Sequence, residues 1–274
     1  MSKNKPKINR LIWDIETSPN VAFLWRTGYK LNVGHHNILK ERAIICICYK
    51  WEGEKKVYSL KWDMNQSDKE LCRKFLKVID SADEIVAHNG DRFDLPMFNG
   101  RCLINKLDPS GIPKTVDTLS IARRRFRLNS NKLDYISKML GHGGKLDTNY
   151  DMWKKILLKN DRRVLSEMVE YCKKDVVINE KVFHELNKYH NNKTHVGVVE
   201  GRDRWTCPNC GSDHIHSSGS EVRLSGNRRH KMKCKSCGKN YLIAENVFRD
   251  FREAKYDENQ RKSKKTRVKA RTRR

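Results

Sequence analysis

The sequence predicts an α/β fold, in which a mixed sheet flanked by helices is followed by a small cysteine-rich module and a basic tail. Short apolar runs typical of strands alternate with helical patterns over residues 8–190. Two Cys-x-x-Cys pairs lie beyond residue 200. From Arg261 to Arg274, nine of fourteen residues are basic and none is acidic. These observations divide the chain into three parts.

The first part opens with apolar runs that favour strands. Residues 8–15, 21–25 and 43–51 are expected to form a three-stranded meander, and residues 57–60 a further strand. Ser67-Asp-Lys-Glu70 has the sequence of a capping box and predicts the start of a helix that extends through Ile79.

Strands and helices alternate in the remainder of the first part. A short buried strand is expected over residues 84–88, and helices over residues 95–104, 132–140 and 161–189. Gly141 follows the second of these helices and favours its end. This alternation indicates a sheet that is mixed rather than purely antiparallel.

The charge of the chain indicates a polyanionic partner. The 274 residues include 58 Lys+Arg and 33 Asp+Glu, which gives a net charge of +25. Residues 1–190 carry 36 basic and 24 acidic residues, and residues 191–274 carry 22 and 9, so charge is concentrated in the shorter part. A membrane is the weaker alternative, because no apolar run approaches the roughly 20 residues of a spanning helix.

The N-terminal residues and the cysteines favour a reducing compartment. The first seven residues are polar and lack the apolar core of a signal peptide. Five cysteines lie outside the paired motifs and are expected to be core residues; they are Cys46, Cys48, Cys72, Cys102 and Cys172. We therefore expect a cytoplasmic protein.

Acidic residues lie at element ends in an order that predicts a metal site. Asp14 and Glu16 are two apart near a strand end, so both side chains lie on one face. Asp94 lies at a strand-to-helix junction, and Tyr171 and Asp175 are four apart on a helix. Each acid alone is also consistent with a surface residue or a cap. Clustered carboxylates repel unless a hard cation neutralises them, and two cations about 3.5–4 Å apart can clamp a phosphodiester.

These residues carry a family resemblance. Asp14-Ile-Glu16, Asn89-x-x-x-Phe93-Asp94 and Tyr171-x-x-x-Asp175 resemble the three motifs of DnaQ-like 3′→5′ exonucleases with a ribonuclease-H fold, in the tyrosine variant called DEDDy. Residues 87–96 and 171–175 are similar to proofreading domains of family B DNA polymerases. The stretch from residue 13 to 175 also resembles small stand-alone exonucleases of bacteriophages, which implies a host-cytoplasmic location.

The resemblance covers about residues 8–190 and implies an exonuclease domain over residues 1–192. It implies that Asp14, Glu16 and Asp175 hold the tighter of two Mg²⁺ or Mn²⁺ ions, with Asp14 bridging to the second. Asp94 would complete the cluster, partly through water. Tyr171 would orient the attacking water, because its high reference pKa makes it a poor base.

Four further residues take supporting places in this resemblance. Asn89 and Phe93 would shape the pocket for the 3′ end of the substrate. Asp117 is placed where the family often has a structural acid. His88 is expected to be a packed histidine at the end of a strand rather than a base.

The cysteine pairs predict a zinc ribbon over residues 203–246 that holds one structural Zn²⁺. Cys207 and Cys210 are separated from Cys234 and Cys237 by 23 residues, which suits a closed four-thiolate site. The spacing predicts an enlarged hairpin near residues 217–227. Three nearby histidines are expected at the surface: His214, His216 and His230.

Basic segments of the chain are expected to bind nucleic acid. In the ribbon, Trp205 or Tyr241 is expected to stack on bases, although a solvated basic face is the alternative. Residues 249–274 are expected to form a disordered tail that adds salt-sensitive affinity. The cluster Arg123–Arg127 suits either the substrate backbone or a solvated helix face.

The sequence thus predicts a metal-dependent 3′→5′ exonuclease that acts on single-stranded or frayed DNA ends. The alternatives are a 3′→5′ exoribonuclease and a non-catalytic nucleic-acid-binding adaptor, for example in replication, repair or recombination complexes. The complete set of acids argues against the adaptor. Cleavage of DNA flaps by an endonuclease is a lesser alternative.

Overall fold

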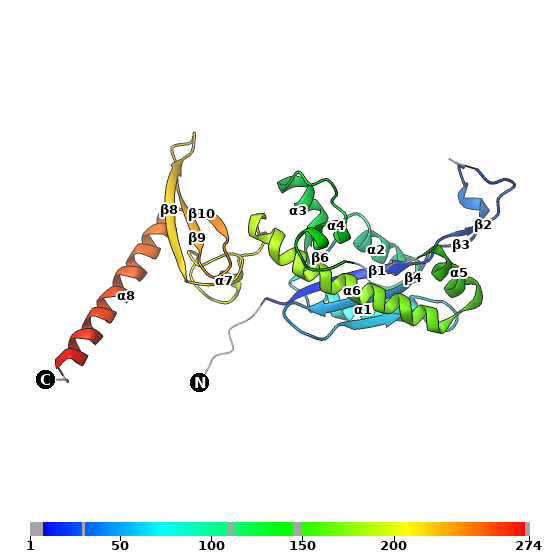
Figure 1. Ribbon diagram of the computed structural model, residues 1–274, viewed down its shortest axis with the longest axis horizontal. Coiled ribbons are helices and arrows are strands. Elements are labelled where there is room, and N and C mark those ends of the chain that lie inside the picture. The colour runs from blue at the N-terminus through cyan, green and yellow to red at the C-terminus, as the bar shows by residue number, and fades with distance from the viewer. Residues whose placement is uncertain (1–7, 29–30, 109–110, 112, 145–148, 272–274) are drawn as a thin grey trace. The chain divides into compact units, whose positions relative to one another are not determined.

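A five-stranded mixed sheet lies at the centre of the first part of the chain (Figure 1). The computed structural model describes residues 8–28, 31–108, 111, 113–144 and 149–271. The strands, in the order β5-β4-β1-β6-β7, are Tyr58–Lys61, Ile44–Trp51, Arg10–Thr17, Glu84–Ala87 and Lys114–Asp117. β1 pairs antiparallel with β4 and parallel with β6, which confirms the predicted mixed sheet.

Strand β1 divides its side chains between two cores. Trp13 and Ile15 face one core, whereas Ile12 belongs to the other. Asp14 and Glu16 share the parity of Ile12 and therefore the same face of the sheet. The alternation expected from the sequence is confirmed.

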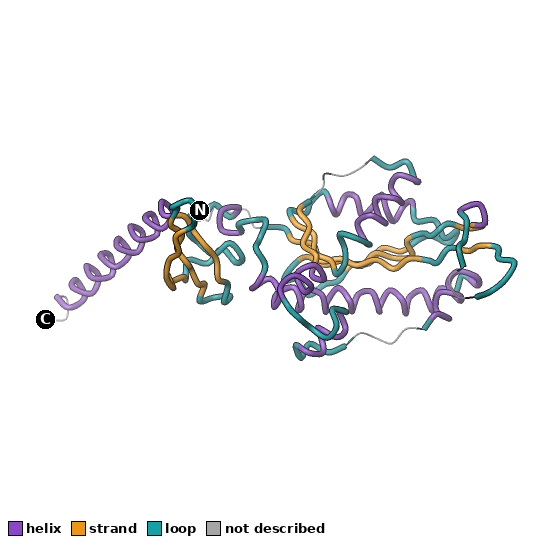
Figure 2. The backbone as a smooth tube through the Cα atoms, turned by 90° about the horizontal axis from the view of Figure 1, so that it is seen from above, coloured by secondary structure: helices purple, strands orange, loops and turns teal. Residues whose placement is uncertain are grey.

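Helices cover both faces of the sheet, so the strands lie between two helical layers (Figure 2). Helices α1 (Lys69–Ile79) and α2 (Asp94–Ile104) pack on the face of Trp13, whose ring lies 5.1 Å from that of Phe75. The opposite face contacts α6 (Arg162–Leu186), together with α3 (Thr118–Arg125), α4 (Leu133–Met139) and α5 (Tyr150–Lys159). The sequence did not predict β7 or α5.

Polar bonds fix helix α6 along the sheet. Lys50 of β4 and Glu180 of α6 form a buried ion pair, and Glu180 also accepts a hydrogen bond from the backbone N–H of Gly53 at 2.8 Å. The Thr118 hydroxyl donates to the Asn179 side chain at 2.8 Å. Because these groups are buried, sliding the helix would leave them unsatisfied.

The expectation of a strand over residues 21–25 in the main sheet is wrong. Strand β2 (Val21–Ala22) pairs instead with β3 (Ile38–Lys40) in a separate two-stranded sheet, next to the short 3₁₀ helix η1 (His35–Asn37). We call residues 19–28 and 31–42 the β2–β3 arm. Its root is closed by Ser18, whose backbone N–H donates to Ala43 O and whose Oγ accepts from Ala43 N, at 2.9 and 3.0 Å. The chain therefore leaves β1, forms the arm and returns as β4.

The expected capping box that begins at Ser67 does not form, because the N-cap residue of α1 is Asp68. The Asp68 side chain does not cap the helix and is instead bonded to other segments of the chain. Its carboxylate is fully buried and accepts hydrogen bonds from Arg101 Nε at 2.6 Å and from the backbone N–H of Ile44 at 2.9 Å. Burial alone would raise the pKa of Asp68, but bonds from Arg101, Ile44 and Asn105 hold it below its ordinary value.

Residues from Asn187 onward belong to a second unit of the chain. Its sheet has the order β10-β9-β8, made of Asn240–Ala244, Arg228–Cys234 and Ile215–Val222. β8 and β9 pair antiparallel, so the predicted hairpin is confirmed. The unit also contains η2 (Asn187–Tyr189), α7 (Val196–Val199) and α8 (Glu245–Arg271).

The expectation of a disordered tail over residues 249–274 is contradicted by α8, which extends to Arg271, while residues 272–274 lie outside the described part. Val247 and Phe251 are buried in the core of the ribbon sheet and anchor the start of this helix. Residues 245–271 contain no Gly or Pro and are rich in good helix formers, so nothing interrupts the helix once it is anchored. Across the described residues, no helix combines the length and apolar character needed to cross a membrane.

Replacing Asp68 by Ala is expected to destabilise the sheet-containing unit by about 3–5 kcal/mol, because Arg101 would remain partly buried without its partner. Chemical denaturation followed by far-UV circular dichroism measures this. Asp151→Ala, which removes an exposed ion pair with Lys154, should change stability by less than about 1 kcal/mol.

The Asp68 carboxylate also makes stability depend on pH. Its folded pKa lies below the unfolded value of about 3.9, so its contribution is present above that pH and is lost as the pH falls through the folded value. Equal loss of stability in the Asp68 and Asp151 variants would contradict this account.

Candidate active site

Three of the predicted carboxylates meet on the face of the sheet covered by α6. Asp14 and Glu16 of β1 and Asp175 of α6 each place one carboxylate oxygen within 4.8 Å of the other two. Asp175 is only 2% exposed, and the other two are half-buried. Such a set of oxygen ligands suits a hard divalent cation, which would offset the mutual repulsion of the three charges.

Asp94 lies beside this cluster but outside the 4.8 Å set found among the described residues. It is the first residue of α2, is 2% exposed, and its Oδ1 accepts a hydrogen bond of 3.2 Å from the backbone N–H of Ile15. Ile15 stands between Asp14 and Glu16 in β1. The fourth acid therefore contacts the strand that carries two of the others.

Tyr171 lies on α6, one turn before Asp175, and is half-buried. The two residues share a helix face, as their spacing predicted. Its phenol group therefore belongs to the same side of α6 as the carboxylate cluster.

The loop between β6 and α2 carries Asn89 and Phe93. Asn89 has φ of 72°, a left-handed conformation that asparagine tolerates better than most residues. Phe93 directly precedes α2 and is 37% exposed, which is unusual for a large aromatic side chain. The pocket-forming roles expected for both residues stay predictions.

Asp117 does not join the carboxylate cluster but makes hydrogen bonds to the backbone of this loop and of α3. Its Oδ1 accepts hydrogen bonds from the backbone N–H groups of Leu119 at 2.9 Å and Ser120 at 3.2 Å, so it caps α3. The same oxygen accepts the N–H of Asn89 at 3.0 Å. Asp117 thus ties the helix start to the left-handed residue of the loop.

His88 is a packed histidine, as the sequence analysis expected. Its Nδ1 lies 2.9 Å from Thr118 Oγ1 and its Nε2 lies 3.0 Å from the carbonyl oxygen of Asn131. Both ring nitrogens are therefore engaged in structural contacts, which leaves neither for acid–base chemistry.

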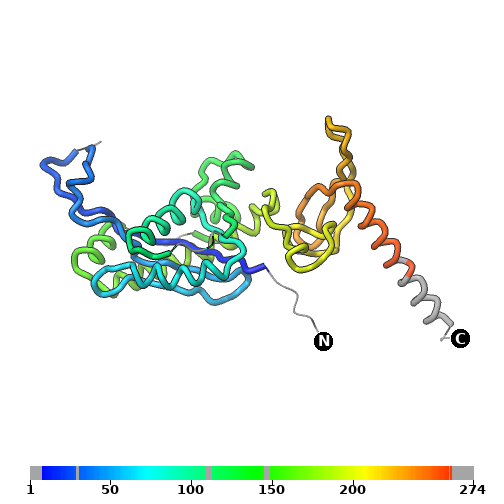
Figure 3. The backbone as a smooth tube through the Cα atoms, turned by 180° about the vertical axis from the view of Figure 1, so that it is seen from behind, coloured from blue at the N-terminus to red at the C-terminus, as the bar shows by residue number. Residues whose placement is uncertain are grey.

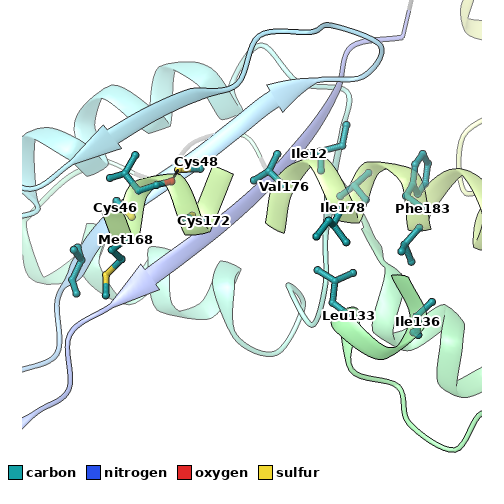
Figure 4. Packing of buried hydrophobic residues seen from close by; sticks show 14 of the residues in the cluster. Ile12, Cys46, Cys48, Leu133, Ile136, Met168, Cys172, Val176, Ile178 and Phe183 are labelled. Carbon is teal, nitrogen blue, oxygen red and sulfur yellow. Dashed lines mark hydrogen bonds between the residues drawn. The ribbon is translucent and has the colours of Figure 1, made fainter. Parts of the chain in front are cut away.

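A group of three thiols lies behind the carboxylates and was not anticipated. Cys46, Cys48 and Cys172 are fully buried, as expected for core residues, but their sulfurs also lie within 4.8 Å of one another. In the register of β1 with β4, Asp14 is opposite Cys48 and Glu16 is opposite Cys46. Figure 4 shows the three cysteines where α6 packs on the sheet. Their two-residue spacing in β4 was the signal in the sequence.

One of the three thiols contacts the acidic site directly. Cys172 Sγ lies 3.5 Å from Asp14 Oδ2 and from Asp14 O. Burial raises the pKa of Cys172, whereas hydrogen bonds with Cys172 and Cys46 lower that of Cys48 to about 6. A buried thiol therefore contacts the side of Asp14 that faces the core.

Four further thiols meet in the second unit. Cys207 Sγ lies 3.6 Å from Cys237 Sγ, and Cys210 Sγ lies 3.7 Å from Cys234 Sγ. A tetrahedral ion with metal–sulfur bonds of about 2.3 Å would separate its ligands by roughly 3.8 Å. The observed spacing fits such an ion and is far from the roughly 2.05 Å of a disulfide. Mutual hydrogen bonds raise the pKa of Cys207 and lower that of Cys237.

One expectation about the ribbon is wrong, and another narrows to a single residue. His230 is 8% exposed rather than superficial, because its ring stacks on Phe248 at 3.6 Å and its Nε2 lies 2.8 Å from a Glu245 carboxylate oxygen. Trp205 is 7% exposed and packs against Phe251, so of the two aromatic residues expected to stack on bases only the half-buried Tyr241 stays a candidate. His214 is exposed, as expected.

A family model decides the relationship of this chain to known proteins. The model of the RNase_H superfamily matches residues 39–187, more than half of the chain. The chain belongs to the RNase_H superfamily. The predicted ribonuclease-H-like fold is thereby confirmed, and membership of this superfamily supports nuclease activity that depends on divalent metal and acts on nucleic acid.

A solved structure shows the same fold. The family B DNA polymerase from the hyperthermophilic archaeon Pyrobaculum calidifontis aligns with a TM-score of 0.53 and 14% sequence identity. The alignment covers 71% of this chain but only 26% of the polymerase chain, so this chain spans about a quarter of that protein. No curated protein matches the sequence.

Proposed function

We propose that this RNase_H superfamily member is a 3′→5′ exonuclease that hydrolyses the terminal phosphodiester of DNA and releases nucleoside 5′-monophosphates. The observation that carries the proposal is the convergence of Asp14, Glu16 and Asp175 within 4.8 Å. The order of motifs around these residues supports the 3′→5′ direction, and the fold shared with a DNA polymerase favours DNA over RNA.

The acidic residues fit two Mg²⁺ or Mn²⁺ ions. Asp14, Glu16 and Asp175 would hold the tighter ion, Asp14 would also contact the second, and Asp94 would complete the cluster, partly through water. When bound, the pair would supply an activated water and neutralise charge on the attacking and leaving oxygens. Oxygen ligands alone suit either metal.

The protein's own residues would position the reacting groups. Tyr171, on the same helix face as Asp175, would orient the attacking water. Asn89 and Phe93 would contact the sugar and base of the 3′ nucleotide. The hydrogen bond from Ile15 N–H to Asp94 keeps β1 and the start of α2 in fixed relation, so Asp94 stays beside Asp14 and Glu16.

The second unit would hold the nucleic acid. We assign the exonuclease domain to residues 1–192 and the ribbon to residues 203–246, with one structural Zn²⁺ on Cys207, Cys210, Cys234 and Cys237. A cavity of about 840 Å³ opens on the ribbon sheet and is lined by Arg204, Arg223, Arg229, Lys231 and Lys239, with no acid among its lining residues. Such a cationic surface suits phosphates.

Cleavage of a 5′-labelled single-stranded DNA and its RNA counterpart tests the catalytic proposal, with Mg²⁺, with Mn²⁺ or with EDTA. The wild type is expected to shorten DNA from the 3′ end only when metal is present. Asp14→Ala/Glu16→Ala should reduce the rate by more than about 100-fold, because loss of even an outer-shell partner costs up to that factor.

Asp151→Asn, an exposed change on α5, is the matched control and should cleave normally. Shortening of RNA alone would support the exoribonuclease instead. Uncut DNA together with a shifted band in a binding gel would support the adaptor.

Zinc content tests the ribbon. Purified protein is expected to contain about one zinc per chain, and Cys234→Ala should lose that zinc and make residues beyond about 200 sensitive to protease, since structural zinc sites contribute directly to folding. Mass spectrometry of the metal and limited proteolysis measure both effects. Cys102→Ala, which alters a cysteine of the other unit, should keep its zinc. Zinc retained in full by Cys234→Ala would refute the four-thiolate site.

A further inference from the structure

The β2–β3 arm exposes large apolar side chains that do not pack in any of the hydrophobic cores of the described residues. Phe23 is 71% exposed and Trp25 is 104% exposed, with Leu24 between them at 50%. By contrast, Trp13 and Trp62 of the same unit are each 1% exposed. Three consecutive large apolar side chains that are all exposed form a patch rather than a scattered residue, and such patches mark binding surfaces.

The arm is held in place, so this exposure is a property of a defined structure. Phe23 donates its backbone N–H to Asn37 O at 3.0 Å across the arm. The backbone N–H of Arg42 donates to Asn20 Oδ1 at 2.7 Å near the root. Figure 3 shows the arm as the blue hairpin that projects from the sheet-containing unit.

The arm begins beside the carboxylate cluster. It continues directly from β1, and Phe23 is the seventh residue after Glu16. Extended chain spans at most about 3.6 Å per residue, so the two positions are at most about 25 Å apart. The root is also packed, because Trp153 Nε1 donates to Thr17 O at 3.0 Å. A single strand with its 3′ end at the carboxylates can therefore reach the arm with its preceding nucleotides.

The charge of the arm fits a nucleic acid. Residues 19–28 and 31–42 contain three cationic residues and one acid, Glu41. Arg26 and Arg42 are exposed, so they are available to phosphates. Exposed aromatic rings interspersed with cations are the combination that binds single strands without reading their sequence.

We propose that the β2–β3 arm is a stacking platform for unpaired bases upstream of the 3′ end. Phe23 and Trp25 stack on bases, and Arg26 and Arg42 contact the backbone between them. Bases within a duplex have no free faces, so the arm selects single strands. This inference deepens the proposed exonuclease function and rests on it for the position of the 3′ end.

The binding of a short fluorescent single-stranded oligonucleotide, measured by anisotropy in EDTA, tests the platform without cleavage. Phe23→Ala/Trp25→Ala in the full chain is expected to weaken binding by about 10-fold or more, the size expected for stacking on one or two bases. Trp25→Phe keeps a ring and should keep most of the affinity. Leu103→Ala, at a 79% exposed position on α2, is the matched control and should bind normally.

Two further measurements separate the platform from the catalytic site. A blunt duplex should bind the double variant and the wild type equally. The p-nitrophenyl ester of thymidine 5′-monophosphate, too small to reach the arm, should be hydrolysed equally by both proteins. Unchanged oligonucleotide binding in the double variant, or equal weakening for single strand and duplex, would overturn the platform. Failure of the wild type to hydrolyse the ester, with arm-dependent binding intact, would count against the exonuclease alone.

Discussion

The packing of helix α6 across the sheet is the constraint on which the site depends. Asp175 meets Asp14 and Glu16 only in one register of α6 against β1. That register is fixed by the buried Lys50–Glu180 ion pair, by the hydrogen bond from the Thr118 hydroxyl to the Asn179 side chain, and by apolar contacts along the helix. Three carboxylates in this small volume repel one another, so the surrounding core has to hold them until a cation neutralises them.

Much of this site was predictable, because its geometry follows from local periodicity. Two-residue spacing in β1 places Asp14 and Glu16 on one face, and four-residue spacing in α6 places Tyr171 above Asp175. The group of three thiols behind Asp14 was not predicted. It arises from the pairing register of β1 with β4 and from the docking of Cys172, which are long-range properties.

The errors made from sequence have the same origin. The capping box expected before α1 does not form because the Asp68 carboxylate accepts hydrogen bonds from Arg101 and Ile44, which are distant in sequence. Residues 21–25 have the apolar content of a core strand, yet the bonds of Ser18 with Ala43 divert them into the arm. The charged segment after Phe251 was expected to be disordered by composition, but helix α8 is nucleated by burial of its first turns.

Binding of Mn²⁺, followed by electron paramagnetic resonance, tests the central claim that β1 and α6 together build one cation site. Asp175→Asn is expected to weaken Mn²⁺ binding by more than about 10-fold. Asp117→Asn, whose side chain can still cap α3, should bind Mn²⁺ as the wild type does. Wild-type affinity in the Asp175 variant would show that α6 does not contribute to the site and would contradict the account.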